Sequence, residues 1–169
     1  MSKSKIVAMV ALIAFAMGIF LVDDALAGER HKTRSVTHNV KWNPINVPDE
    51  QGHVIASLEN KGIVTNLEGK AFCDGWLVEF QALWESNPKM DIGAGYGYWG
   101  GTDRDGDKVY ARWEAKKVKG DPHSRGTLTI IKGTGKWEGI QGRHTFVGTV
   151  VAPGEQYADQ DWDIELPRR

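Results

Sequence analysis

Large apolar side chains recur at every second position in several stretches of this chain. In 74–84 they fall on one face of an extended segment, and 108–116 repeats the pattern; the residues on these faces are Trp76, Val78, Phe80, Ala82, Trp84, Val109, Ala111, Trp113 and Ala115. Successive side chains of a β-strand point to opposite sides, so a period of two predicts strands with one face on a core.

Further strands are predicted where β-branched or alternating residues lie between turn signals. The segments are 35–42, 53–58, 63–65, 127–132, 144–151 and 161–166, and the turns include 60–62, 87–88, 105–107, 120–122 and 153–154. Eight or nine strands, about one in every dozen residues, favour an antiparallel sandwich or barrel. A closed barrel leaves no exposed strand edge, so we predict an all-β, closed antiparallel barrel of about eight strands.

The first 27 residues are predicted to be a signal peptide. Lys3 and Lys5 precede an uncharged run, 6–22, and Ala25 and Ala27 provide a cleavage site. A retained membrane anchor is the alternative, but the run is short for a span of about 20 residues. We expect cleavage after Ala27, export to the periplasm or medium, and no stable membrane insertion afterwards. Residues 28–36 are predicted to be a flexible lead-in and 37–169 a single barrel domain.

Composition limits the partners and the chemistry. The formal net charge is −1, from 21 Lys+Arg and 22 Asp+Glu, which argues against a nucleic-acid binder. Cys73 is the single cysteine, so no intramolecular disulfide can form. Asp103, Asp105 and Asp107 resemble a calcium loop, but Lys108 stands where that loop requires glycine, so a plain turn is predicted. We predict no metal site and no cofactor.

Two glycine-rich segments indicate how the barrel is built. The segment 93–101 contains five glycines beside Tyr96, Tyr98 and Trp99, which favours a bent strand with rings lying across it. The segment 133–142 (GTGKWEGIQG) joins two predicted strands; we expect Trp137 to fold over the turn and Ile140 to plug the barrel end.

The segment 133–142 resembles the glycine-rich G-T-G element of allene oxide cyclase-like and dirigent-like β-barrels. The order of elements over 93–151 is also similar to theirs. This resemblance implies an eight-stranded barrel with a hydrophobic cavity, a small hydrophobic ligand and, in several members, trimers. It does not carry over an activity, because the catalytic acids of those enzymes match no positions here and a fold hosts many functions.

The predicted ligand-binding residues are inward-facing rings and one histidine: Trp76, Phe80, Trp84, Trp113, His144 and Phe146. Small residues on the same faces leave space for a cavity, and an aromatic lining prefers flat or apolar ligands. The first hypothesis is an exported protein that binds a small hydrophobic or aromatic molecule.

Two other functions compete with ligand binding. One is a cyclase or isomerase of the allene oxide cyclase type that acts by pocket shape, with His144 as the candidate acid or base and Tyr96 and Arg112 as weaker polar candidates. The other is a module that forms a homo-oligomer through its outer wall, where Leu77 and Leu83 are expected to be exposed.

Overall fold

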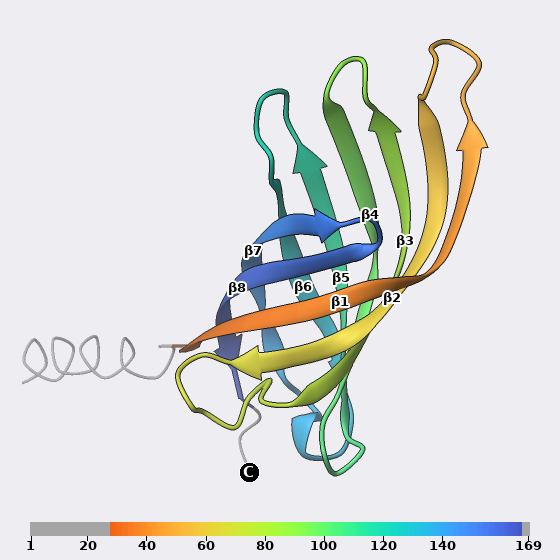
Figure 1. The fold of residues 1–169 in the computed structure, drawn as a ribbon. Coiled ribbons are helices and arrows are strands. Elements are labelled where there is room, and N and C mark those ends of the chain that lie inside the picture. The colour runs from red at the N-terminus through yellow and green to blue at the C-terminus, as the bar shows by residue number, and fades with distance from the viewer. Residues whose placement is uncertain (1–27, 167–169) are drawn as a thin grey trace, which may run out of the picture.

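The computed structural model describes residues 28–166, and these form a closed barrel of antiparallel strands (Figure 1). The elements in order are β1 (Glu29–Asn46), β2 (Val54–Asn66), β3 (Trp76–Asn87), β4 (Ile92–Thr102), β5 (Lys108–Lys117), β6 (Ser124–Gly133), the 3-10 turn η1 (Gly135–Trp137), β7 (Gln141–Ala152) and β8 (Glu155–Glu165). Each strand pairs with the next, and β1 pairs with β8 to close the barrel. The predicted fold class is therefore confirmed. The predicted signal peptide lies outside the described residues.

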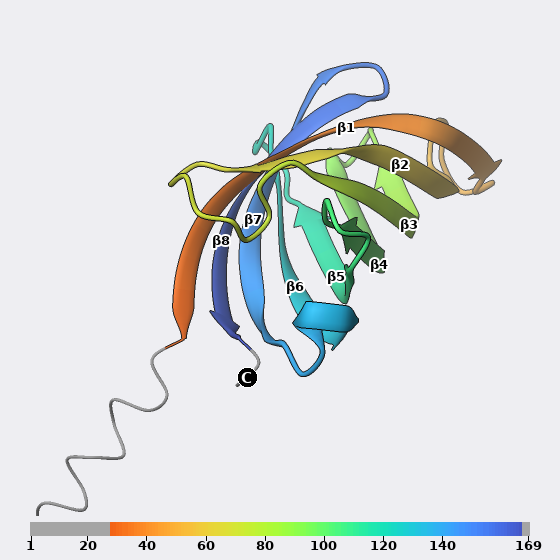
Figure 2. The ribbon, with the colours of Figure 1, turned by 90° about the horizontal axis from the view of Figure 1, so that it is seen from below.

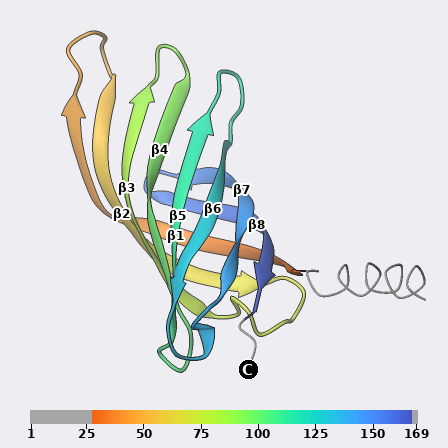
Figure 3. The same ribbon diagram turned by 180° about the vertical axis from the view of Figure 1, so that it is seen from behind.

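The wall of the barrel has unequal height. β1 pairs with β8 only over 29–38, whereas it pairs with β2 as far as Asn46. The β1–β2, β3–β4 and β5–β6 hairpins consequently extend past the β7–β8 hairpin at one end (Figures 1 and 3). This leaves a mouth on the side of β7 and β8.

The opposite end of the barrel is filled. Phe72, from the loop between β2 and β3, packs its ring 5.2 Å from that of Trp76 and 5.3 Å from that of Trp162. Trp137 of η1 lies 5.8 Å from the same ring, and Ile140 beside it is 4% exposed. The loop and η1 lie at the same end of the barrel (Figure 2). Ile140 therefore helps to close this end of the barrel as expected from the sequence, and Trp137, which was expected to fold over the turn, packs into the same closure.

The acidic turn between β4 and β5 belongs to this closure. The Asp103 carboxylate accepts hydrogen bonds from Trp137 Nε1 at 2.8 Å and from the backbone of Asp105 at 2.8 Å, and it pairs with Lys136 Nζ at 2.8 Å. Burial opposes ionisation of Asp103, but these donors outweigh it and hold the pKa below its usual range. Within the described residues, no three His, Cys, Asp or Glu side chains are placed to hold a metal ion.

Two sequence predictions about the first strands are wrong. Residues 29–36, expected to be a flexible lead-in, form the first half of β1, and the turn expected at 60–62 lies inside β2. In β1 the side chains that face the interior of the barrel are polar, Thr33 and Ser35 among them, so this strand lacks the alternation of apolar and polar residues that predicts a strand. Gly62 marks a close approach rather than a turn, because a Cβ there would lie 2.7 Å from Thr37 Cα of β1.

Candidate functional site

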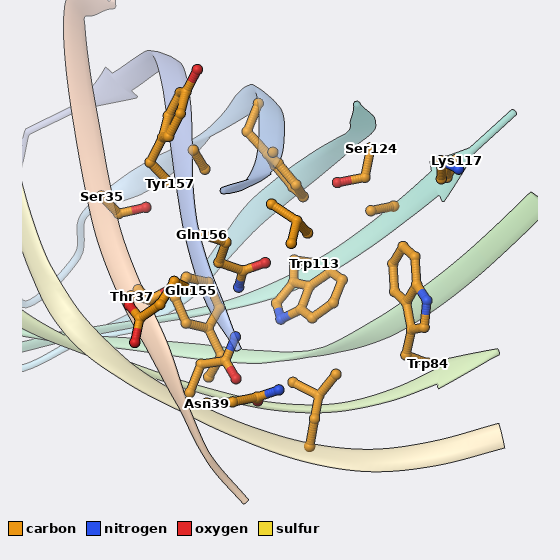
Figure 4. Close-up of a pocket in the computed structure, with 18 of the residues that line it drawn as sticks. Ser35, Thr37, Asn39, Trp84, Trp113, Lys117, Ser124, Glu155, Gln156 and Tyr157 are labelled. Carbon is orange, nitrogen blue, oxygen red and sulfur yellow. The ribbon is translucent and has the colours of Figure 1, made fainter. Parts of the chain in front are cut away.

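The open half of the barrel contains a pocket of about 490 Å³. Four half-buried rings form one wall, and neutral polar side chains from β1, β2 and β8 form another. The rings are Phe80, Trp84, Trp113 and Phe146; the polar residues are Ser35, Thr37, Asn39, Asn60, Gln156 and Gln160. Figure 4 shows the labelled polar residues of β1 and β8 on one side and Trp84 and Trp113 on the other.

Three of these rings, Phe80, Trp113 and Phe146, form an arc that continues to His144. The centroid of Trp113 lies 6.4 Å from that of Phe80 and 6.3 Å from that of Phe146, both edge to face. Phe146 lies 5.7 Å from His144, which packs 4.0 Å from Trp162 of the closed end. Edge-to-face aromatic pairs are favourable, so each ring helps to hold the next in place.

Trp84 is positioned by the glycine-rich strand β4. Gly93 and Gly95 pair with the end of β3, and the indole of Trp84 covers them. A Cβ at Gly93 would lie 2.8 Å from Trp84 Cζ2, and one at Gly95 would collide with the same ring. Rings do lie across the glycines of this strand, but they are Trp84 on Gly93 and Gly95 and Trp99 on Gly101; Tyr96 and Tyr98, which the sequence also suggested, point outward.

Part of the polar wall is held by its own hydrogen bonds. Trp162 Nε1 donates to Thr33 Oγ1 at 3.0 Å, and Thr33 Oγ1 donates to Gln160 Oε1 at 2.6 Å. Gln160 Nε2 in turn donates to Ser35 Oγ at 3.3 Å. This chain links the closed end to the pocket and fixes the orientation of the Gln160 amide.

Four other polar atoms of the lining residues have no hydrogen-bond partner among the described residues. They are Asn39 Oδ1, Asn60 Oδ1, Trp113 Nε1 and His144 Nε2. Asn60 is 5% exposed and His144 is 2% exposed. Asn39 and Asn60 are cross-strand partners, and Asn60 is also paired with Phe80, so the two asparagines lie beside the aromatic wall.

His144 is uncharged. Burial lowers its pKa to about 3, and the hydrogen bond from the ring to the Thr145 carbonyl opposes this shift only in part. Nδ1 lies 3.1 Å from that carbonyl oxygen, which can only accept, so Nδ1 carries the proton. Nε2 is therefore left as a hydrogen-bond acceptor.

The tips of the three long hairpins are tied to one another by polar contacts. Glu50 accepts hydrogen bonds from Asn87 at 2.9 Å and from Lys89 at 3.0 Å, which joins the β1–β2 turn to the β3–β4 turn. Asp91 pairs with Lys117 and accepts from the Gly120 backbone at 2.9 Å, which joins the β3–β4 and β5–β6 turns. These contacts stabilise the rim on the side of the long hairpins.

His53 adds a further contact near this rim. Its Nδ1 lies 2.7 Å from Asp49 and its Nε2 lies 2.9 Å from Glu85, and the hydrogen bonds to these carboxylates raise its pKa. The side chain thus links the β1–β2 turn to β3.

Five of the six residues predicted from the sequence to contact a ligand line this pocket: Phe80, Trp84, Trp113, His144 and Phe146. Trp76 does not line the pocket. It is the first residue of β3, at the filled end of the barrel, and its ring packs there against Phe72 and Trp137. Tyr96 is 62% exposed and Arg112 is also exposed, so neither reaches the interior.

The sequence does not reveal the polar wall, because small polar side chains on a strand usually indicate the face that is exposed to solvent. The inward residues of 31–37 alternate with Lys32, Arg34 and Val36, and this period of two is the signal that the sequence offers. Leu77 and Leu83 do lie on the outer wall, 63% and 43% exposed. Among residues 28–166, no helix is long and apolar enough to cross a membrane.

No protein-family model matches the sequence, and no curated protein matches it either. Solved structures do match. The pterocarpan synthase dirigent protein GePTS1 superposes with a TM-score of 0.51 at 12% identity, over 84% of this chain and 91% of that one. The pterocarpan synthase dirigent protein PsPTS1 superposes with a TM-score of 0.51 at 9% identity, over 83% and 97%. At these identities the likeness concerns architecture alone: the chain has the eight-stranded barrel fold that dirigent proteins also have.

Proposed function

We propose that this protein is an exported β-barrel that binds a small hydrophobic or aromatic molecule in the open half of its interior. The observation that carries the proposal is the arc of rings around a pocket of about 490 Å³. Pockets for small molecules usually have volumes of about 300–1,000 Å³ and combine an apolar lining with a few polar groups. This pocket has both properties.

The aromatic wall supplies the expected binding free energy. Phe80, Trp84, Trp113 and Phe146 are each half-buried and so keep apolar surface available to a ligand. Burying apolar surface contributes roughly 25 cal/mol per Å² removed from water. A flat molecule in contact with two or more of these rings therefore gains affinity without a charged group.

A substitution that fills the pocket tests this proposal. Ala158 lines the pocket, whereas Ala94 lies on the outer wall of β4 and serves as the matched control. We expect compounds from a panel of small aromatic and alicyclic molecules to raise the unfolding temperature and quench tryptophan fluorescence. Ala158→Leu should weaken their binding at least about tenfold by occupying the space (~1.4 kcal/mol), and Ala94→Leu should not. A panel in which no compound binds, or equal binding by the two variants, contradicts the proposal.

Export is part of the proposal and rests on the sequence of residues 1–27. The uncharged run 6–22, preceded by Lys3 and Lys5 and followed by Ala25 and Ala27, has the organisation of a cleaved leader. Amino-terminal sequencing of the protein recovered outside the cytoplasm should begin at Gly28. A sequence that begins at Met1 would contradict cleavage.

A second candidate is catalysis of a cyclisation or isomerisation by the shape of the pocket. Two observations support it: the aromatic wall can hold a substrate in one conformation, and the two similar structures described above are pterocarpan synthase dirigent proteins. His144 lines the pocket, but burial lowers its pKa to about 3 and makes it a weak base, so under this candidate the shape of the pocket rather than proton transfer directs the reaction. Once a converted compound is found, Ala158→Leu should abolish turnover and Ala94→Leu should not.

A further inference from the structure

His53 joins the turn between β1 and β2 to the neighbouring strand β3, and this turn stands at the open end of the barrel (Figure 1). The residue is 9% exposed. Its Nδ1 lies 2.7 Å from Asp49 Oδ1 of the same turn, and its Nε2 lies 2.9 Å from Glu85 Oε1 near the end of β3. The imidazole therefore lies between two acidic groups that belong to different elements of the rim.

Both of these contacts require the charged form of the ring. An ionised carboxylate can only accept a hydrogen bond, and only the imidazolium carries an N–H group on each nitrogen. In the neutral ring, one nitrogen would direct a lone pair at a carboxylate oxygen, so one hydrogen bond would be replaced by repulsion. The hydrogen bonds with Asp49 and Glu85 raise the pKa of His53 from its ordinary value of 6.5, although burial opposes them. The ring therefore loses its second proton above pH 6.5.

The other ionic contacts of this rim do not titrate in that range. Glu50, in the same turn as His53, is paired with Lys89 at 3.0 Å, and Asp91 of the β3–β4 turn is paired with Lys117. Carboxyl groups titrate near pH 4 and lysines at about pH 10.4, so these pairs stay ionised between pH 6.5 and 9. The contact through His53 is the one of these that changes.

We propose that the β1–β2 turn is a pH-dependent latch on the rim of the pocket: doubly protonated His53 holds the turn against β3, and loss of one proton releases it. The hairpin that carries this turn contributes Trp42 and Leu58 to the pocket lining, and Glu85 directly follows the lining residue Trp84. The latch therefore lies beside the mouth of the pocket. The inference concerns the protein without a ligand, so it and the proposed function can each fail while the other stands.

Backbone amide exchange of the ligand-free protein measures the order of this turn. The protection factor of an N–H group is its intrinsic exchange rate at a given pH divided by the observed rate, which removes the direct effect of pH on exchange. The Val47 N–H donates to the His53 carbonyl at 2.9 Å and reports on the turn. The Asp103 N–H donates to the Asp107 carbonyl at 2.9 Å and is the reference at the closed end.

We expect the protection factor of the Val47 N–H to fall at least about fivefold between pH 6.5 and 9, because a hydrogen bond between charged groups is lost. The protection factor of the Asp103 N–H should change by less than about twofold over the same range, because the groups that hold its turn do not titrate there.

The variant Glu85→Gln separates the charge of the ring from the contact itself. The new amide can donate to an unprotonated Nε2 while Nδ1 keeps its proton for Asp49, so the neutral ring makes both hydrogen bonds. We expect the Val47 protection factor of this variant to differ by less than about twofold between pH 6.5 and 9. Glu79→Gln, on the exposed face of the same strand, is the matched control and should show the full fall.

A Val47 protection factor that is equal at pH 6.5 and 9 in the wild-type protein would overturn the inference. A fall in Glu85→Gln as large as that in the wild type would also overturn it, because the pH dependence would then come from another group. An equal fall at Asp103 would show that the whole barrel loosens and would overturn the assignment to the turn.

Discussion

His144 shows how one buried side chain carries both structure and chemistry. Its ring contacts Trp162 on one side and Phe146 on the other, and its Nδ1 proton is held by the Thr145 carbonyl. This environment excludes the charged form, because burial in an apolar setting disfavours an imidazolium. The closed end of the barrel and the pocket therefore share a residue that must stay neutral.

The neutral state of His144 makes stability depend on pH. Its folded pKa of about 3 lies below the unfolded value of 6.5, so between these values the unfolded chain binds more protons and acidification favours unfolding. We expect the unfolding free energy to fall from pH 6.5 to 5 with a slope approaching about 1.4 kcal/mol per pH unit from this residue. Denaturant titrations at several pH values measure this slope.

The variant His144→Gln should lose most of that slope. His31, whose pKa is lowered chiefly by burial and by Lys70, has a slope of the same sign that remains in the variant. His53 acts in the opposite direction: its raised pKa gives stability that is complete at low pH and lost as pH rises through the folded value, so it does not disturb the window from pH 6.5 to 5. Equal slopes in wild type and His144→Gln would show that the ring is protonated in the folded protein.

At the scale of single residues, the sequence could predict the aromatic lining but not its polar counterpart. Phe80, Trp84 and Trp113 follow from alternation alone, because large apolar rings at every second position mark an inner face. Thr33 and Ser35 sit inside for a reason the sequence does not display, namely their hydrogen bonds with Gln160. Gln160 is 127 and 125 residues away from them along the chain, and it becomes their neighbour only because β1 pairs with β8.

Strand β4 shows how an element is shaped for its neighbour. Its inward positions 93 and 95 are glycine, and this leaves room for the Trp84 indole of β3 to lie against the wall, whereas Gly97 lies against Ala82. Gly100, in contrast, points outward, where the nearest side-chain atom to an added Cβ, Glu79 Cγ, would lie 3.6 Å away. The glycines of one strand therefore differ in role.

A pair of alanine substitutions tests this difference. In Gly95→Ala the new Cβ would lie 2.8 Å from the Leu83 carbonyl oxygen and would collide with Trp84, so the ring must move; we expect a loss of about 1–3 kcal/mol in unfolding free energy. Gly100→Ala should change stability by about 0.5 kcal/mol or less. Chemical denaturation measures both, and a shift in tryptophan fluorescence should accompany only the first. Similar losses of unfolding free energy in the two variants would show that Trp84 does not pack on Gly95.

At the scale of elements, the sequence could predict β3 and β5 closely and β1 and β2 poorly. The first pair alternates apolar and polar residues, whereas β1 is polar on both faces and β2 contains Asn60-Lys61-Gly62, which has the composition of a turn. Tertiary pairing decides these segments: Asn60 is paired with Asn39 on one side and Phe80 on the other. Local composition carries no information about those partners.

The whole molecule is a barrel with one filled end and one open end. Phe72, Trp76, Trp137 and Trp162 fill the first. Three long hairpins form one side of the second, and the β7–β8 side is lower (Figures 1 and 3). The sequence predicted a barrel but left open whether its aromatic rings would meet and fill the interior. The answer depends on where along the barrel axis each ring lies, which alternation alone does not give. The distribution of the seven tryptophans between the two ends answers this question.

This distribution permits a direct test of the central claim, that a ligand binds in the open end. Trp42, Trp84 and Trp113 line the pocket, whereas Trp76, Trp99, Trp137 and Trp162 belong to the closed end. The measurement is a nitrogen–proton NMR spectrum of the indole N–H groups, assigned with single Trp→Phe variants, during titration with the tightest-binding aromatic compound of the panel. We predict that the signals of Trp42, Trp84 and Trp113 move with a common saturation curve while the other four stay in place; movement confined to the closed-end group, or none at all, would contradict the account.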